Sequence, residues 1–132
     1  VREEGPSPFY NIKYAESKDG ISWERNGVVC IDYKNNDEWA IATPRIKKEE
    51  NAYKMWYSYR GVVPYRIGFA ESKDGISWER KDEQAGITVS ETGWDSEMVE
   101  YAYVFDHKNE RYMVYNGNEH GRDGLGIAIL EK

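Results

Sequence analysis

Hydrophobic and polar positions alternate along several short stretches of the chain. Residues 42–48, 53–59, 65–72 and 77–80 read as strands, and the alternation is clearest over residues 53–59. Turn residues separate these stretches. Asp74 and Gly75 form the strongest turn signal, because glycine reaches positive φ without steric cost. No stretch has a helical period, so the pattern predicts an all-β protein with antiparallel strands.

An internal repeat organises these strands. Residues 15–25 return unchanged as residues 70–80, at an offset of 55. A weaker repeat relates residues 53–57 to residues 111–115 at an offset of 58. Eleven identical residues in a row exclude coincidence. A unit of 55 to 58 residues therefore occurs about twice, with an extra half unit at the start.

A four-stranded unit repeated at this spacing is the signature of a propeller blade. We therefore expect residues 1–132 to form a single domain, a partial five-bladed β-propeller of about 2.3 four-stranded antiparallel blades. Residues 9–25 supply a half blade, residues 26–80 a full blade, and residues 81–132 a blade that lacks its last strand.

A propeller usually closes with at least about four blades. An isolated piece exposes blade faces and strand edges, which invites pairing with another chain. The chain is therefore either a fragment of a longer protein or a subunit that assembles with copies of itself. Two copies would supply eighteen strands, close to the twenty of five blades, so we expect a homodimer that completes the propeller.

Composition and charge narrow the classes of partner. The net charge is −6 with scattered Lys and Arg, which argues against nucleic acid. No apolar run approaches the roughly 20 residues of a membrane helix, and no signal-peptide layout is visible. We therefore expect a soluble protein without a membrane partner, favour the cytoplasm, and leave open a signal lost before Val1. The single cysteine, Cys30, excludes an internal disulfide and is expected to be a buried, inert thiol.

Two motifs then indicate a family. The sequence Lys-Met-Trp-Tyr at residues 54–57, followed by residues 67–80, resembles the five-bladed β-propeller glycosidases. These are the arabinanase, xylosidase, invertase and levansucrase-like enzymes of glycoside hydrolase families 43 and 32. The resemblance runs from about Tyr10 to Leu130 and corresponds to roughly the last two-fifths of a full-length relative. It implies a carbohydrate-active protein that hydrolyses or binds a glycan at a central funnel.

The chain departs from that family pattern at three places on the expected innermost strands. Thr43 and Pro44 precede Arg45 where relatives are expected to have Arg-Pro, and Tyr101-Ala102 replaces an expected Tyr-Pro pair. Glu100 stands where a small or apolar residue is expected.

The resemblance also implies where a ligand binds, at the rim formed by the connections between blades and the loops between second and third strands. Glycoside hydrolysis needs two carboxyl groups that face one bond. Glu97 is the first candidate for the general acid because it begins an innermost strand, and Asp95 and Glu100 are the alternatives. The substrate-binding candidates on the same rim are Arg45, Asp37, Glu38, Trp39, Trp94, Asn116, Asn118, His120 and Arg122. The alternative is that these are solvated loop residues or parts of a glycine-rich turn.

Residues 17–23 and 72–78 lie on the opposite rim and resemble the Asp-box of sialidases in role. Their Asp side chains are expected to bind local backbone N–H groups, and Trp23 and Trp78 to pack between sheets. These residues are therefore expected to build the fold. No zinc, calcium or phosphate-binding motif is present, so we expect neither metal nor cofactor.

Three functions remain open at this stage. The chain is a glycosidase-like enzyme, a non-catalytic sugar-binding or assembly module, or a fragment kept soluble by self-association. In a dimeric ring, two Glu97 residues across the axis would supply a carboxylate pair.

Overall fold

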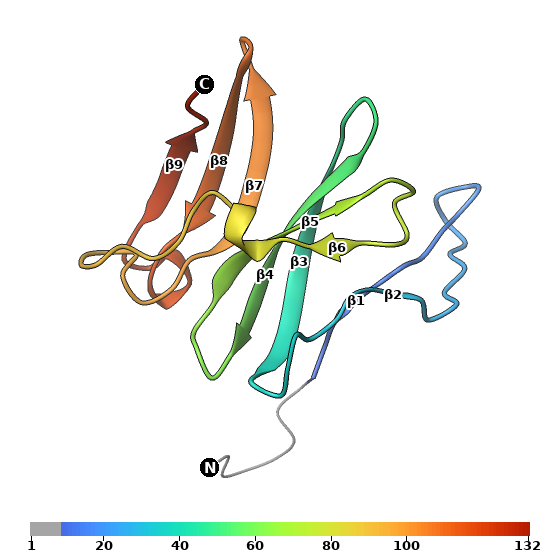
Figure 1. Cartoon of the computed structure of the whole chain (residues 1–132), viewed down its shortest axis with the longest axis horizontal. Helices are drawn as coiled ribbons and strands as arrows, with labels where there is room; N and C mark the ends of the chain where they lie inside the picture. The colour runs from blue at the N-terminus through green and yellow to red at the C-terminus, as the bar shows by residue number, and fades with distance from the viewer. Residues whose placement is uncertain (1–8) are drawn as a thin grey trace.

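The structure is a computed structural model that describes residues 9–132. It contains three antiparallel sheets, with the four-stranded sheet between the other two (Figure 1). The first sheet pairs β1 (Ile12–Lys13) with β2 (Val29–Ile31). The second is β3 (Glu38–Lys48), β4 (Tyr53–Gly61), β5 (Arg66–Ser72) and β6 (Glu79–Arg80). The third is β7 (Glu100–His107), β8 (Glu110–Asn116) and β9 (Leu125–Ile129).

This architecture confirms the predicted all-β class and the partial propeller. Consecutive strands are neighbours throughout the second and third sheets, as in a propeller blade. β2 lies inside the range that the sequence analysis assigned to the full blade, and in the structure it pairs with β1. The helical segments within residues 9–132 are two short 3₁₀ turns, η1 (Asp82–Gln84) and η2 (Glu119–Gly121). No helix in this part of the chain is long and apolar enough to cross a membrane.

The hydrophobic core lies between successive sheets, because each sheet buries an apolar face against the next. Between the first and second sheets, Ile12 and Ile31 meet Ile41, Met55 and Tyr57. Between the second and third sheets, the core contains Trp56, Ile67, Phe69, Val99, Met113 and Tyr115. The second and third sheets therefore repeat their contacts, with Met113 and Tyr115 standing 58 residues after Met55 and Tyr57.

A bulge interrupts the first strand of both larger sheets at matching positions. The register shifts between Ala42 and Arg45 in β3 and after Glu100 in β7. Thr43 and Tyr101 adopt φ values of 52° and 55°, a region that side chains other than glycine's seldom occupy. The buried Ser58 ties the two bulges together, because its Oγ accepts bonds from Thr43 Oγ1 and Tyr101 N, both at 2.9 Å. The strained backbone is thus pinned at one point between the sheets.

The two Asp-Gly turns have the internal bonding expected of them. The Asp74 carboxylate accepts the backbone N–H groups of Ile76 and Ser77 at 2.8 Å, and Asp19 does the same for Ile21 and Ser22. These bonds lower the pKa of both carboxyl groups to about 2. The two turns differ in their tryptophans, since Trp78 packs against the core while Trp23 is 56% exposed.

Replacing Asp74 with asparagine is expected to lower the melting temperature at neutral pH. Asp74 has a depressed pKa in the folded protein and an ordinary one of about 3.9 in the unfolded chain. Its contribution is therefore present above about pH 4 and lost as the pH falls toward 2. As the pH falls from 4 to 2, the melting temperature of Asp74→Asn should decrease less than that of the wild type. Asp123→Asn, which changes an exposed carboxylate, is the matched control; equal melting temperatures for wild type and Asp74→Asn at pH 7 would contradict this account.

Candidate functional site

Three loops meet at the end of the sheets where β4 ends and β7 begins (Figure 1). They are residues 62–65, residues 94–99 and residues 117–124, and together they form what we call the ligand rim. Arg66 Nη1 donates to the carbonyl oxygen of Glu97 at 2.9 Å, and Asn118 N donates to the carbonyl oxygen of Trp94 at 2.7 Å. These bonds fix the loops against one another.

Glu100 is the centre of the polar groups at this rim. It is the first residue of β7 and is fully buried. Its Oε1 lies 2.6 Å from Nδ1 of His120, whereas its Oε2 is buried without a hydrogen-bond partner. Burial raises the pKa of this carboxyl group, and the hydrogen bond to His120 and the charge of Arg60 oppose the rise.

His120 connects this buried carboxyl group to the surface. Its side chain is 58% exposed, and its backbone has a positive φ of 57° within η2. Asn116 Nδ2 holds the carbonyl oxygen of His120 at 3.1 Å, so the strained residue is anchored to the end of β8. Because Glu100 engages Nδ1, the ring nitrogen that can meet a ligand is Nε2.

Aromatic and cationic side chains complete the Glu100 cluster, which we define as Glu100, His120, Arg60, Tyr65 and Tyr10. The rings of Tyr65 and His120 are 6.0 Å apart, edge to face. The hydroxyl groups of Tyr10 and Tyr65 lie 2.9 Å apart. The Arg60 guanidinium carbon stands 5.3 Å from the Tyr65 ring centre, a cation–π contact.

Sequence reasoning did not name Arg60, Tyr65 or Tyr10 as site residues. The internal repeat carried a signal for two of them, since Tyr10 and Tyr65 are separated by the offset of 55. Their shared position places both hydroxyl groups on one rim, and the structure brings them into contact.

The three predicted catalytic carboxylates have different surroundings. Glu97 is exposed, and its backbone N–H donates to Asn118 Oδ1 at 2.8 Å. Asp95 is buried and accepts the hydroxyl group of Tyr115 at 3.1 Å, a contact that holds the loop to β8. Of the three, only Glu100 lies in the cluster.

Several predicted binding residues make contacts within the chain. Glu38 forms a 2.8 Å ion pair with Arg80. Trp94 stacks on Tyr115 at 5.6 Å. Asn118 is buried, where its Oδ1 accepts two backbone N–H groups and its Nδ2 donates to the carbonyl oxygen of Gly93.

The remaining predicted residues are spread over the rim and beyond it. Asp37 is exposed, and Arg122 pairs with Asp123 at 3.0 Å. Arg45 lies past the bulge of β3, with its guanidinium carbon 5.9 Å from the Tyr103 ring centre. Trp39 approaches the cluster, because Arg60 stands 6.0 Å from its ring centre.

The described residues contain no group of three or more His, Cys, Asp or Glu side chains arranged to hold a metal ion. What the cluster does offer is a buried carboxyl group of raised pKa, bonded to an exposed imidazole and flanked by a guanidinium. Such a pair can hold a proton at the rim, and the guanidinium adds a fixed positive charge beside it.

Replacing Glu100 with glutamine is expected to change how stability depends on pH. A raised folded pKa means that the stabilising contribution is fully present below the unfolded value of about 4.3 and is lost as the pH rises through the folded value. Glutamine resembles the protonated form and does not titrate. The difference between the melting temperature of Glu100→Gln and that of the wild type should therefore shift in favour of the variant as the pH rises from 4 to 7. Glu110→Gln, an exposed change at the opposite rim, should show no such trend; parallel curves for Glu100→Gln and the wild type would refute the assignment.

Comparison with known proteins identifies the family to which this chain belongs. The chain matches, over residues 7–125, a family described as β-1,4-mannooligosaccharide phosphorylase, which is glycoside hydrolase family 130. The uncharacterized protein Rv1502 of Mycobacterium tuberculosis (strain ATCC 25618 / H37Rv) is 43% identical over 120 residues, covering 91% of this chain and 40% of its own length. A 1,2-beta-oligomannan phosphorylase of Thermoanaerobacter sp. (strain X514) is 34% identical over 105 residues, covering 74% of this chain and 34% of its own.

A solved structure of a glycoside hydrolase superposes with a TM-score of 0.69 at 22% identity, covering 92% of this chain and 36% of the other. This likeness shows the fold. The chain spans about two-fifths of the length of Rv1502 and about a third of that of the oligomannan phosphorylase. The sequence-based resemblance to glycoside hydrolases is confirmed at that broad level, but its assignment to families 43 and 32 is not supported. The chain belongs instead to the carbohydrate-active β-1,4-mannooligosaccharide phosphorylase family.

Proposed function

We propose that the Glu100 cluster binds a β-linked mannoside in an enzyme that transfers a mannosyl group to phosphate. The family and two relatives support this class of substrate, since those relatives are a 1,2-beta-oligomannan phosphorylase and a beta-1,2-mannobiose phosphorylase. The chain spans about a third of each of those two relatives, so the proposal assigns it part of a larger site.

One observation carries the proposal, the buried Glu100 carboxyl group bonded to the exposed His120 at the ligand rim. Sugar hydroxyl groups both donate and accept hydrogen bonds, and an imidazole beside a carboxyl group can accept or donate the matching bond. Trp39, which is partly buried, lies on the Arg60 side of this pair, and an aromatic face suits the apolar side of a sugar ring.

The reaction would break the bond between the anomeric carbon and the bridging oxygen, and form a bond between that carbon and a phosphate oxygen. A proton passes to the departing oxygen, so the products are mannose 1-phosphate and a shortened sugar. Glu100 and His120 together can hold such a proton near the rim. The Arg60 guanidinium next to Glu100 can attract the phosphate.

The choice of phosphate over water as the acceptor rests on the family and on the two phosphorylase relatives. Hydrolysis needs two carboxyl groups that flank the scissile bond, one of them to activate water or to attack. Phosphate is already an anionic nucleophile and needs no such base. Among the predicted carboxylates of the described chain, Glu100 alone lies in the cluster, with Glu97 exposed outside it and Asp95 bonded to Tyr115.

Sugar binding without catalysis is the second candidate. The rings of Trp39 and the exposed His120 favour it, because stacking against them requires no reacting group. The two candidates share the ligand and differ in whether phosphate takes part.

Titration calorimetry with β-1,4-mannobiose and β-1,2-mannobiose, with and without phosphate, tests the proposal. We expect mannobiose to bind more tightly than cellobiose, and phosphate to bind at the same cluster. His120→Ala and Arg60→Ala should each weaken binding about tenfold, the loss typical of one charge-assisted hydrogen bond. Lys18→Ala, in the turn at the opposite rim, is the control and should bind as the wild type does.

Equal affinities for mannobiose and cellobiose would overturn the choice of sugar. Mannobiose binding that is indifferent to phosphate, with no phosphate affinity lost in Arg60→Ala, would overturn phosphorolysis and leave sugar binding as the function.

A further inference from the structure

The bulge in β7 decides which side chain lies opposite Asn116. Past the bulge, Tyr103 pairs with Val114 of β8. Uninterrupted antiparallel pairing would continue two residues along each strand and place Tyr101 opposite Asn116. The bulge adds one residue to β7, and Glu100 takes that position instead. Since a shift of one residue moves a side chain to the other face of a strand, the bulge determines where the Glu100 carboxyl group points.

Asn116 also holds the partner of Glu100. Its Nδ2 donates to the carbonyl oxygen of His120 at 3.1 Å, and the His120 ring meets Glu100 Oε1 at 2.6 Å. The backbone of His120 has a positive φ of 57°, and that of Glu119 before it has a φ of 54°. Two successive residues other than glycine in this region are costly, so the turn that carries His120 depends on such an anchor.

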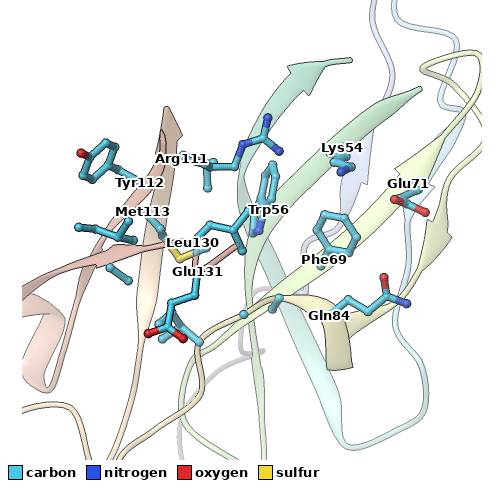
Figure 2. Close-up of a pocket in the computed structure, with 16 residues that line it drawn as sticks. Lys54, Trp56, Phe69, Glu71, Gln84, Arg111, Tyr112, Met113, Leu130 and Glu131 are labelled. Carbon is cyan, nitrogen blue, oxygen red and sulfur yellow. The ribbon is translucent and has the colours of Figure 1, made fainter. Parts of the chain in front are cut away.

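Ser58 anchors the bulge from the second sheet. It lies on the face of β4 that meets the third sheet, because Trp56, two residues before it, packs between the two sheets. Figure 2 shows the Trp56 side chain pointing from the second sheet toward the third, where Met113 lies. Ser58 is fully buried, and its Oγ accepts the N–H of Tyr101 at 2.9 Å. That N–H belongs to the peptide that follows Glu100, so the bond fixes the bulge directly beside this residue.

The two anchors occupy the same position of the internal repeat. Asn116 follows Ser58 by the offset of 58, as Tyr115 follows Tyr57. Ser58 reaches across to the third sheet, and Asn116 reaches into the loop after its own strand. Equivalent positions in two successive blades thus supply the contacts on either side of the Glu100 and His120 pair.

We propose that Ser58 and Asn116 are positioning residues that hold Glu100 and His120 together, Ser58 through the β7 bulge and Asn116 through the His120 turn. Asn116 then acts through His120 rather than by binding substrate directly. The inference rests on the proposed function, which makes this pair the centre of the ligand site. The arrangement of the pair can be measured without sugar or phosphate, so the inference and the proposed function can fail separately.

Carbon-13 NMR of the Glu100 carboxyl group, assigned by comparison with Glu100→Gln, tests both roles through the pKa of this group. Burial raises that pKa in the wild type, and the bond to His120 opposes the rise. Ser58→Ala should lower the pKa toward its ordinary value of about 4.3, because a bulge without its anchor lets water reach the carboxyl group. Asn116→Ala should raise the pKa further, because a released His120 no longer favours the charged form.

Thr43→Val is the matched control for Ser58→Ala. It removes the other hydroxyl group bonded to Ser58 Oγ, at 2.9 Å, and keeps a branched side chain of similar size. Both variants should lower the melting temperature, because each removes a hydrogen bond of the buried Ser58. Thr43→Val should leave the pKa of Glu100 unchanged, since the bond to Tyr101 remains. A purely structural role for Ser58 would not separate the two variants.

Ser58→Cys serves where Ser58→Ala does not fold. The thiol is close in size to the hydroxyl group but accepts hydrogen bonds only weakly, so the pKa of Glu100 should fall, by less than in Ser58→Ala. An unchanged pKa of Glu100 in the folded Ser58 variant would overturn the role of Ser58, and so would an equal fall in Thr43→Val. A pKa that does not rise in Asn116→Ala would overturn the role of Asn116.

Discussion

Packing of each sheet against the next is the constraint on which the rest of this structure depends. None of the three sheets encloses a core of its own, and both hydrophobic clusters lie between sheets. A single sheet of two to four strands leaves its apolar face in water, so stability comes only from stacking. The same stacking sets the loops of neighbouring sheets side by side, which is how Tyr65 reaches His120.

The Glu100 cluster also depends on how the strands are bent. Ser58 holds the bulges of β3 and β7 together, and Glu100 is the residue directly before the bulged Tyr101. A carboxyl group at that point is buried against the neighbouring sheet, where an unpaired charge is costly. His120 offsets this cost through its hydrogen bond to one carboxyl oxygen of Glu100. Burial nevertheless keeps the pKa of Glu100 above its ordinary value.

The sequence allowed the blades to be predicted because identical segments at a fixed offset report directly on identical supersecondary units. It ranked Glu97 before Asp95 and Glu100, whereas the burial of Glu100 and its contact with His120 depend on how β7 and the β8–β9 loop pack, which no alternation pattern reveals. Arg60 was missed for a different reason. Its relation to Glu100 crosses between two sheets, and such contacts follow from packing rather than from spacing along the chain. The resemblance identified the glycoside hydrolases broadly but not the family. The motifs that carried it are residues 54–57 and 67–80, and they lie in strands and an Asp-Gly turn of the second sheet rather than at the Glu100 cluster.

The identity of residues 15–25 and 70–80 has a consequence for how the chain folds. During collapse, either tryptophan can occupy the single site between the first two sheets, because both turns have the same sequence and the same internal bonds. A molecule that seats Trp23 where Trp78 belongs has its strands out of register by one repeat. Local sequence cannot reject that arrangement, so only the contacts made by the unlike flanking strands tell the two apart. Repetition that makes the blades simple to specify thus also makes misregistered folding a competitor to the native state.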